Sequence, residues 1–321
     1  MRTTPIAVIL CAGLLAGCSR GDASTRSNQG ASRPSTATSP AGDQPPPTAA
    51  GPLRIGVTLH PYYSWAKNIA GDLPDVTIVP ILPGETDAGA YQPSTDDIAK
   101  LAHLDAVIIN GIGHDDFIRQ MIDASGNNSL TLIEVNKETP LLPSAHGDAP
   151  NSHTFISFTN AAQQTRLIAK KMAALRPAHA AVFERNAAAY ADKLRKIQAA
   201  AAAQLAGAKI KRVVTVHDGY SYLLQEMGIE LAGVVEPAHG LVPSAKELGE
   251  LIDLVKKQHI RVILSEESFP HKLLDTLAGE TGAKVYIISH IAVGNYSADE
   301  FEKGMQQNVD TLVKALVTDP T

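Results

Sequence analysis

Cysteine is scarce in this chain of 321 residues, which has only two, Cys11 and Cys18. Met1 and Arg2 precede an apolar run that ends just before Cys18, which is the layout of a signal peptide. Removal of residues 1–17 would also remove Cys11 and leave Cys18 as the first residue. We therefore expect no disulfide, no thiolate metal site and no cysteine nucleophile in the mature chain.

Long basic runs and long apolar runs are lacking as well. Lys and Arg number 28 against 33 Asp and Glu, a net charge of −5, and no basic cluster of the kind that binds nucleic acid occurs. The apolar stretch of residues 4–17 is too short to span a bilayer, so we expect no integral membrane architecture. A mildly acidic chain suits a cation better than an anion.

Common enzyme signatures are missing from the sequence. It has no His-Glu-x-x-His, no Gly-x-Ser-x-Gly and no Walker loop, and the Gly111-Ile112-Gly113 segment has Asp116 where a dinucleotide-binding motif needs glycine. We therefore predict that the protein is not an enzyme. One alternative stays open, a metal-dependent hydrolase in which Glu266 or Glu267 acts as base on a metal-bound water.

The N-terminal segment resembles that of bacterial lipoproteins. Leu15-Ala16-Gly17-Cys18 is similar to their lipobox, which implies a signal peptide at 1–17 and an acylated Cys18 as the only membrane anchor. Residues 19–52 are rich in Ser, Thr, Ala, Gly and Pro without an apolar period, so 18–52 is predicted to be an acylated cysteine followed by a disordered tether.

Short β-branched runs alternate with helical patterns from Leu53 onward. The predicted strands cover residues 53–59, 76–82, 105–110, 130–135, 211–216, 229–235, 261–265 and 284–289. Strands separated by helices indicate parallel sheets. We predict an α/β fold of two similar lobes, 53–176 and 209–321, each with a four-stranded, mainly parallel sheet.

One long helix is predicted to join the lobes within residues 177–208. Residues 178–205 are dense in Ala, Lys, Arg, Glu and Gln, which favour helix. About 28 helical residues would extend ~42 Å, enough to run along both lobes. The alternative is a coiled-coil arm, but its apolar positions hold mostly Ala, which makes a weak dimer seam, and we expect a monomer.

Chemistry-bearing side chains follow several of the predicted strands. They are His60 after the first strand, His217 after the fifth, Glu266 and Glu267 after the seventh and His290 after the eighth, with His153 in a loop before the linking segment. Ligands of open parallel sheets lie beyond the carboxyl ends of the strands. Imidazole and carboxylate suit zinc, and also manganese or iron where carboxylates take part.

The order of these segments resembles the metal-binding lipoproteins of bacterial zinc and manganese ABC importers, the TroA-like solute-binding family. The resemblance runs from about Leu53 to Val317 and rests on six motifs in order. They are residues 63–72 (YSWAKNIAGD), 81–86 with 91–94 (ILPGET and YQPS), 105–111 (DAVIING), 151–155 (NSHTF), 216–222 (VHDGYSY) and 243–248 (PSAKEL). It implies a periplasmic or surface-exposed protein that captures a divalent metal between its lobes and delivers it to an ABC permease.

The family's ligand positions are only half preserved. His153 and His217 match directly, whereas Gly89 stands where the family has a loop histidine and Ser289 where it often has an aspartate. We predict a zinc site made by His60, His153, His217 and His290, with Glu266 beside them to orient an imidazole.

Other readings stay open. Asp87, His114 and His239 are reserve ligands. A relative with low metal affinity would also explain the two changed positions, and a non-transport or adhesive binding lipoprotein is a further alternative.

Overall fold

A computed structural model describes residues 51–84, 86, 88, 91–145, 147, 149–236 and 241–319. The predictions for the signal peptide, Cys18 and the tether up to residue 50 lie outside the described residues, as do those for Asp87, Gly89 and His239.

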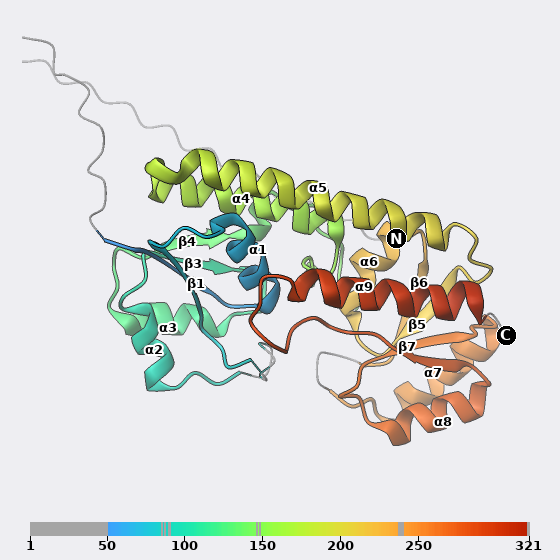
Figure 1. The fold of residues 1–321 in the computed structure, drawn as a ribbon. Coiled ribbons are helices and arrows are strands. Elements are labelled where there is room, and N and C mark those ends of the chain that lie inside the picture. Colours follow the sequence, from blue (N-terminus) through green and yellow to red (C-terminus); the bar gives the residue numbers. More distant parts are fainter. Residues whose placement is uncertain are drawn as a thin grey trace, which may run out of the picture. The chain divides into compact units, whose positions relative to one another are not determined.

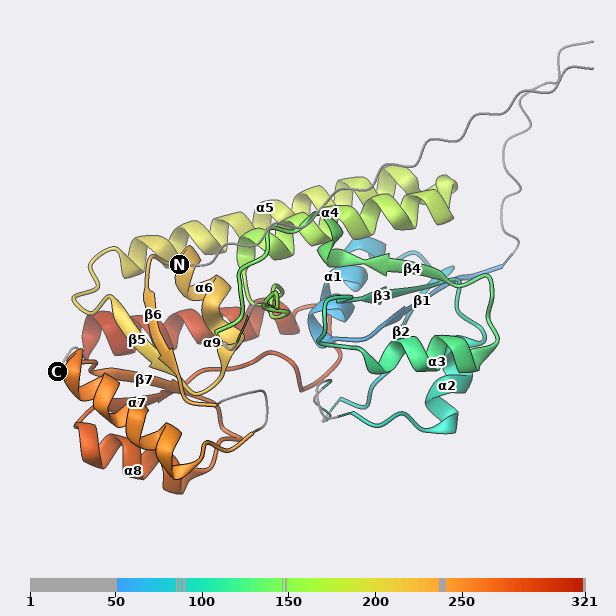
Figure 2. The same cartoon turned by 180° about the vertical axis from the view of Figure 1, so that it is seen from behind.

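The eight predicted strands are confirmed, and each begins and ends within the range that the sequence indicates. They are β1 (Leu53–Val57), β2 (Val76–Pro80), β3 (Ala106–Ile109), β4 (Thr131–Glu134), β5 (Arg212–Thr215), β6 (Glu230–Val234), β7 (Val262–Ser265) and β8 (Lys284–Ile287). They form two four-stranded sheets of order β2-β1-β3-β4 and β6-β5-β7-β8, and every pairing between these strands is parallel. The α/β fold with two similar lobes follows (Figures 1 and 2).

Helices cover the sheets and connect them. They are α1 (His60–Ala70), α2 (Thr95–Leu101), α3 (Phe117–Ser125), α4 (Phe158–Leu175), α5 (Ala180–Leu205), α6 (Ser221–Glu226), α7 (Ala245–Lys257), α8 (His271–Thr281) and α9 (Glu300–Val313). Helix α5 confirms the predicted long helix, and α4 lies along it in both views (Figures 1 and 2). Ser94 and Ser244 begin α2 and α7 with capping boxes that satisfy the first amides of these helices.

A second helix also joins the lobes. Helix α9 follows the second sheet in sequence, yet it packs on α1 of the first lobe and on α5. Phe301 meets Trp65 edge to face with ring centroids 5.2 Å apart, and Ser64 donates to the Ser297 carbonyl at 2.7 Å. Because α5 and α9 both touch the two lobes, the lobes are held together by more than the one linking helix that the sequence indicates.

The strand order determines where side chains beyond the sheets can meet. In each sheet the chain reverses its direction of winding between the two central strands, and ligands of such folds lie at this point. His60 and His114 follow β1 and β3, while His217 and Glu266 follow β5 and β7. Within the part of the chain that the structure describes, no helix combines the length and apolar character needed to cross a membrane.

Candidate metal centre

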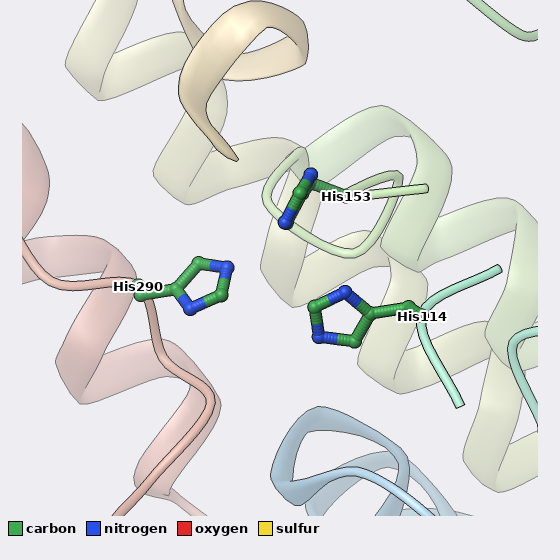
Figure 3. Close-up of side chains that lie close together, drawn as sticks. All are labelled: His114, His153 and His290. Carbon is green, nitrogen blue, oxygen red and sulfur yellow. The ribbon is translucent and has the colours of Figure 1, made fainter. Parts of the chain in front are cut away.

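Four buried histidines from distant segments meet between the lobes. They are His114 after β3, His153 before α4, His217 after β5 and His290 after β8, and we call them the four-histidine cluster. The ring centroids of His153 lie 4.9, 4.6 and 4.9 Å from those of His114, His217 and His290, respectively. Figure 3 shows three of the rings turned toward a shared space from three separate parts of the chain.

Two of these rings face each other through the same type of nitrogen. His153 Nε2 and His217 Nε2 are 2.9 Å apart. The other ring nitrogen of each faces an oxygen: His153 Nδ1 lies 3.0 Å from Asn151 Oδ1, and His217 Nδ1 lies 3.2 Å from Glu236 Oε2. Asn151 Nδ2 donates to the Asp218 carbonyl at 2.7 Å, which fixes the orientation of that amide.

These contacts fix the tautomer of both rings. Amide and carboxylate oxygens only accept, so both Nδ1 atoms carry a hydrogen, and in a neutral ring the Nε2 atom then holds the lone pair that a metal ion binds. Two lone pairs at 2.9 Å repel each other, so these two nitrogens share either a proton or a metal ion. A tetrahedral zinc ion with Zn–N bonds of ~2.05 Å holds its nitrogens about 3.3 Å apart. The two Nε2 atoms therefore need to move apart by only a few tenths of an ångström to bind zinc.

Potential ligand atoms form two overlapping groups among the described residues. His114, His153 and His290 make one group, and His217, Glu266 and His290 make the other, with all ligand atoms of a group within 4.8 Å of one another. Glu266 Oε1 accepts a hydrogen bond of 2.7 Å from the buried hydroxyl of Tyr220. Burial, and then the nearby Glu266 carboxylate, raises the pKa of Tyr220 well above its usual value, so this hydroxyl remains a donor.

Of the four ligands predicted from the sequence, the structure brings together His153, His217 and His290 but not His60. The ring of His60 stacks on Tyr296 with centroids 4.1 Å apart, and its Nε2 lies 3.0 Å from the Gly294 carbonyl. Neither ligand group includes it. His114, a reserve in the sequence prediction, takes the place expected for His60.

Two glycines allow the rings to reach their positions. Gly113 has a φ of 110°, a conformation that favours glycine, and it turns the chain so that His114 enters the cluster. At Gly219 a Cβ atom would lie 2.8 Å from His217 Cδ2 and 3.1 Å from His290 Cδ2. A side chain at this position would therefore displace both imidazoles.

The loop that carries His114 is held by a buried carboxylate. Asp115 Oδ2 accepts from Asn110 N and from Thr58 Oγ1, both at 2.6 Å. Burial raises the pKa of Asp115, and these bonds act against that rise. Glu266, predicted to orient an imidazole, accepts from Tyr220 and lies in one ligand group with His217 and His290, while Glu236 contacts His217. Sequence reasoning missed Glu236, although it comes two residues after β6.

The segment around His153 is attached to the second lobe, although it precedes that lobe in sequence. Asp218 Oδ2 accepts from Ser144 Oγ at 3.0 Å and from Ala145 N at 2.7 Å. Tyr222 Oη donates to the Asn151 carbonyl at 2.7 Å. The Glu226 carboxylate accepts from Phe158 N at 3.0 Å and from Thr159 N at 2.8 Å. From the first lobe, Asn110 Nδ2 donates to the Ser152 carbonyl at 2.8 Å, so the segment of His153 is bonded to both lobes.

Comparison with known families identifies the family of this chain. Residues 55–315 match the family model described as zinc-uptake complex component A, periplasmic. The chain belongs to this zinc-uptake component A family.

Proteins similar to this chain are named for, or were solved with, several metals. The zinc-binding lipoprotein AdcA of Streptococcus pneumoniae is 29% identical over 254 residues, which cover 75% of this chain but 50% of AdcA. This chain thus spans about half the length of AdcA. The solute-binding protein FpvC of Pseudomonas aeruginosa in complex with Ni²⁺ is 43% identical, with a TM-score of 0.78 over 84% of this chain and 98% of FpvC. FpvC with Mn²⁺ is 44% identical, with a TM-score of 0.77 over 83% of this chain and 98% of FpvC.

Proposed function

We propose that this protein captures a divalent cation, zinc before manganese or iron, in the four-histidine cluster and delivers it to the permease of an ABC importer. The observation that carries the proposal is the 2.9 Å approach of His153 Nε2 and His217 Nε2, in two rings whose Nδ1 atoms both face oxygens. Four imidazoles in a buried space supply the all-nitrogen set that suits zinc. The protein binds and releases its cargo without chemical turnover.

Names of related proteins support this proposal. The family is described as a component of a zinc-uptake complex, and AdcA as a zinc-binding lipoprotein. The FpvC complexes with Ni²⁺ and Mn²⁺ support a site that accepts other divalent cations. Transfer to a permease follows from the description of the family as one component of an uptake complex.

Metal binding by the purified, untagged protein tests the proposal directly. We expect one zinc ion per chain by elemental analysis, and at least a tenfold loss of zinc affinity by calorimetry in His153→Ala and in His217→Ala. His103→Ala is the matched control, because His103 is exposed and lies outside both ligand groups. Unchanged affinity in the two variants contradicts the proposal, and ester or amide hydrolysis that chelation abolishes favours an enzyme.

Transport needs a test in cells. We expect deletion of the protein to lower cellular zinc and to slow growth when zinc is scarce. Unchanged zinc content and growth would favour a binding or adhesive role without transport.

We also propose that the protein acts outside the cytoplasm, attached by an acylated Cys18. The leader-like residues 1–17 and the lipoprotein description of AdcA support this anchoring. We expect Cys18→Ser to lose labelled fatty acid and to leave the membrane fraction. Membrane attachment that survives this change contradicts the anchor.

A further inference from the structure

A second place for the cargo lies beside the four-histidine cluster. His290 belongs to both groups of potential ligands, and His217 of the second group touches His153 of the first. The group of His217, Glu266 and His290 therefore shares its imidazoles with the cluster and adds one carboxylate. A cation moves between the two groups by exchanging some ligands while it keeps His290.

The four-histidine cluster and the group of His217, Glu266 and His290 differ in exposure. All members of the four-histidine cluster are buried, whereas Glu266 is half-buried and its neighbour Glu267 is exposed. A cation bound by Glu266 thus lies on the side of the cluster from which solvent approaches.

A cavity of about 280 Å³ marks this approach. Its lining includes Glu266, Glu267 and His290, together with Val293 and Ile287, which are exposed at the surface. A cation in this cavity therefore meets two carboxylates together with the His290 imidazole. Negative charge along such a route raises the local cation concentration.

Glu266 is held in position for such a contact. The Tyr220 hydroxyl is fully buried and donates to Glu266 Oε1 at 2.7 Å, so it fixes the carboxylate while the second oxygen remains for a cation. Two imidazole nitrogens and one carboxylate oxygen form a ligand set that zinc and other divalent cations accept.

We propose that His217, Glu266 and His290 form an outer position at which the divalent cation is held on its way into and out of the four-histidine cluster. This inference rests on the proposed function, because it concerns the same cargo. Fewer ligands and greater exposure make the outer position weaker than the cluster, and its carboxylate makes ligand exchange easier.

The test isolates the outer position by removing a ligand that only the cluster uses. In His153→Ala, calorimetry with Co²⁺ is expected to show one weak site per chain. Adding Glu266→Gln should lower its affinity at least tenfold, since glutamine can still accept from Tyr220 but lacks the charge. Adding Glu267→Gln instead is the matched control and should change the affinity less than twofold.

The outcomes separate this inference from the function on which it rests. Absence of Co²⁺ binding in His153→Ala, or residual binding that Glu266→Gln leaves unchanged, overturns the outer position. Absence of metal binding in the unaltered protein overturns the proposed function itself. His114→Ala gives a second background, with the same expected outcomes, if His153→Ala does not fold.

A kinetic measurement on the intact cluster provides an independent check. In the otherwise unaltered protein, Glu266→Gln should slow zinc association in stopped-flow experiments at least fivefold while the equilibrium affinity changes less than threefold. An unchanged association rate contradicts a role on the entry route.

Discussion

At His217 the ring nitrogen that faces away from the cluster is bound by Glu236, and this contact determines how well the other nitrogen can bind a metal. Carboxylate partners of this kind orient the ring and increase its basicity, and their loss costs roughly 10–100-fold in metal affinity. We expect Glu236→Ala to weaken zinc binding about tenfold by calorimetry. Glu250→Ala, an exposed carboxylate on α7, should have no effect, and equal losses in both variants would show that only net charge matters.

His114 and His60 give a direct comparison between two histidines that follow central strands of the same sheet. We expect His114→Ala to lower zinc affinity at least tenfold, because its ring joins the cluster. His60→Ala should lower it less than threefold, because that ring stacks on Tyr296. Calorimetry on both variants measures the difference, and a larger loss in His60→Ala would return His60 to the ligand set.

The sequence could predict which end of the sheet carries the site but not which side chain reaches it. Strand ends placed His60, His217 and His290 at the carboxyl edges, where all three are found. The reach of a loop depends on backbone turns, such as the one at Gly113, which a single sequence does not reveal. The partners Asn151 and Glu236 depend on contacts between segments far apart in the chain, for which no local pattern exists.

At the scale of elements, strands and helices were predictable because their patterns are local. Strands of a parallel sheet are buried on both faces, so β3 appears as a short, continuous apolar run and β1 as an apolar run interrupted only by Arg54. The alanine-rich composition of α5 favours helix without any tertiary contact. The packing of α9 back onto α1 was not predictable, because it depends on contacts such as Trp65 with Phe301 across more than two hundred residues.

Helix α4 begins next to His153, and a residue of the other lobe holds its first turn. The Glu226 carboxylate accepts from Phe158 N and Thr159 N, and from Gln198 of α5 at 2.8 Å. A carboxylate at a helix N-terminus satisfies amides that have no partner within the helix. This one bond network thus joins α4, α5 and α6.

We expect Glu226→Ala to lower the free energy of unfolding by about 1–2 kcal/mol, measured by chemical denaturation. Zinc affinity should also fall, because the segment between residues 142 and 159 loses one of its attachments to the second lobe. Gln225→Ala is the matched control, since its exposed side chain lies next to Glu226 on the same helix. A stability equal to that of the control would contradict the role of this contact.

At the scale of the whole described region, α5 and α9 both connect the lobes and oppose a wide hinge opening. His217 and His290 come from the second lobe and His114 from the first, while the segment of His153 is bonded to both lobes, through Asp218 and Tyr222 and through Asn110, which donates to the Ser152 carbonyl. A small displacement between the lobes therefore changes the distances from His114 to His217 and to His290.

Binding between the lobes also predicts how zinc changes the stability of the protein. A ligand present at one hundred times its Kd, and bound only by the folded state, adds about 2.7 kcal/mol to the free energy of unfolding. Zinc requires neutral imidazoles, and an ordinary imidazole titrates near pH 6.5, so at pH 5 each histidine that must lose its proton weakens binding by roughly thirtyfold. At a fixed zinc concentration we therefore expect the gain in the free energy of unfolding that zinc provides to fall below about 1 kcal/mol when the pH is lowered from 7.5 to 5. Chemical denaturation at both pH values, with zinc and with a chelator, measures this gain. The double variant His153→Ala, His217→Ala is the control and should gain little stability from zinc at either pH. A zinc increment as large at pH 5 as at pH 7.5 would mean that imidazoles do not hold the metal.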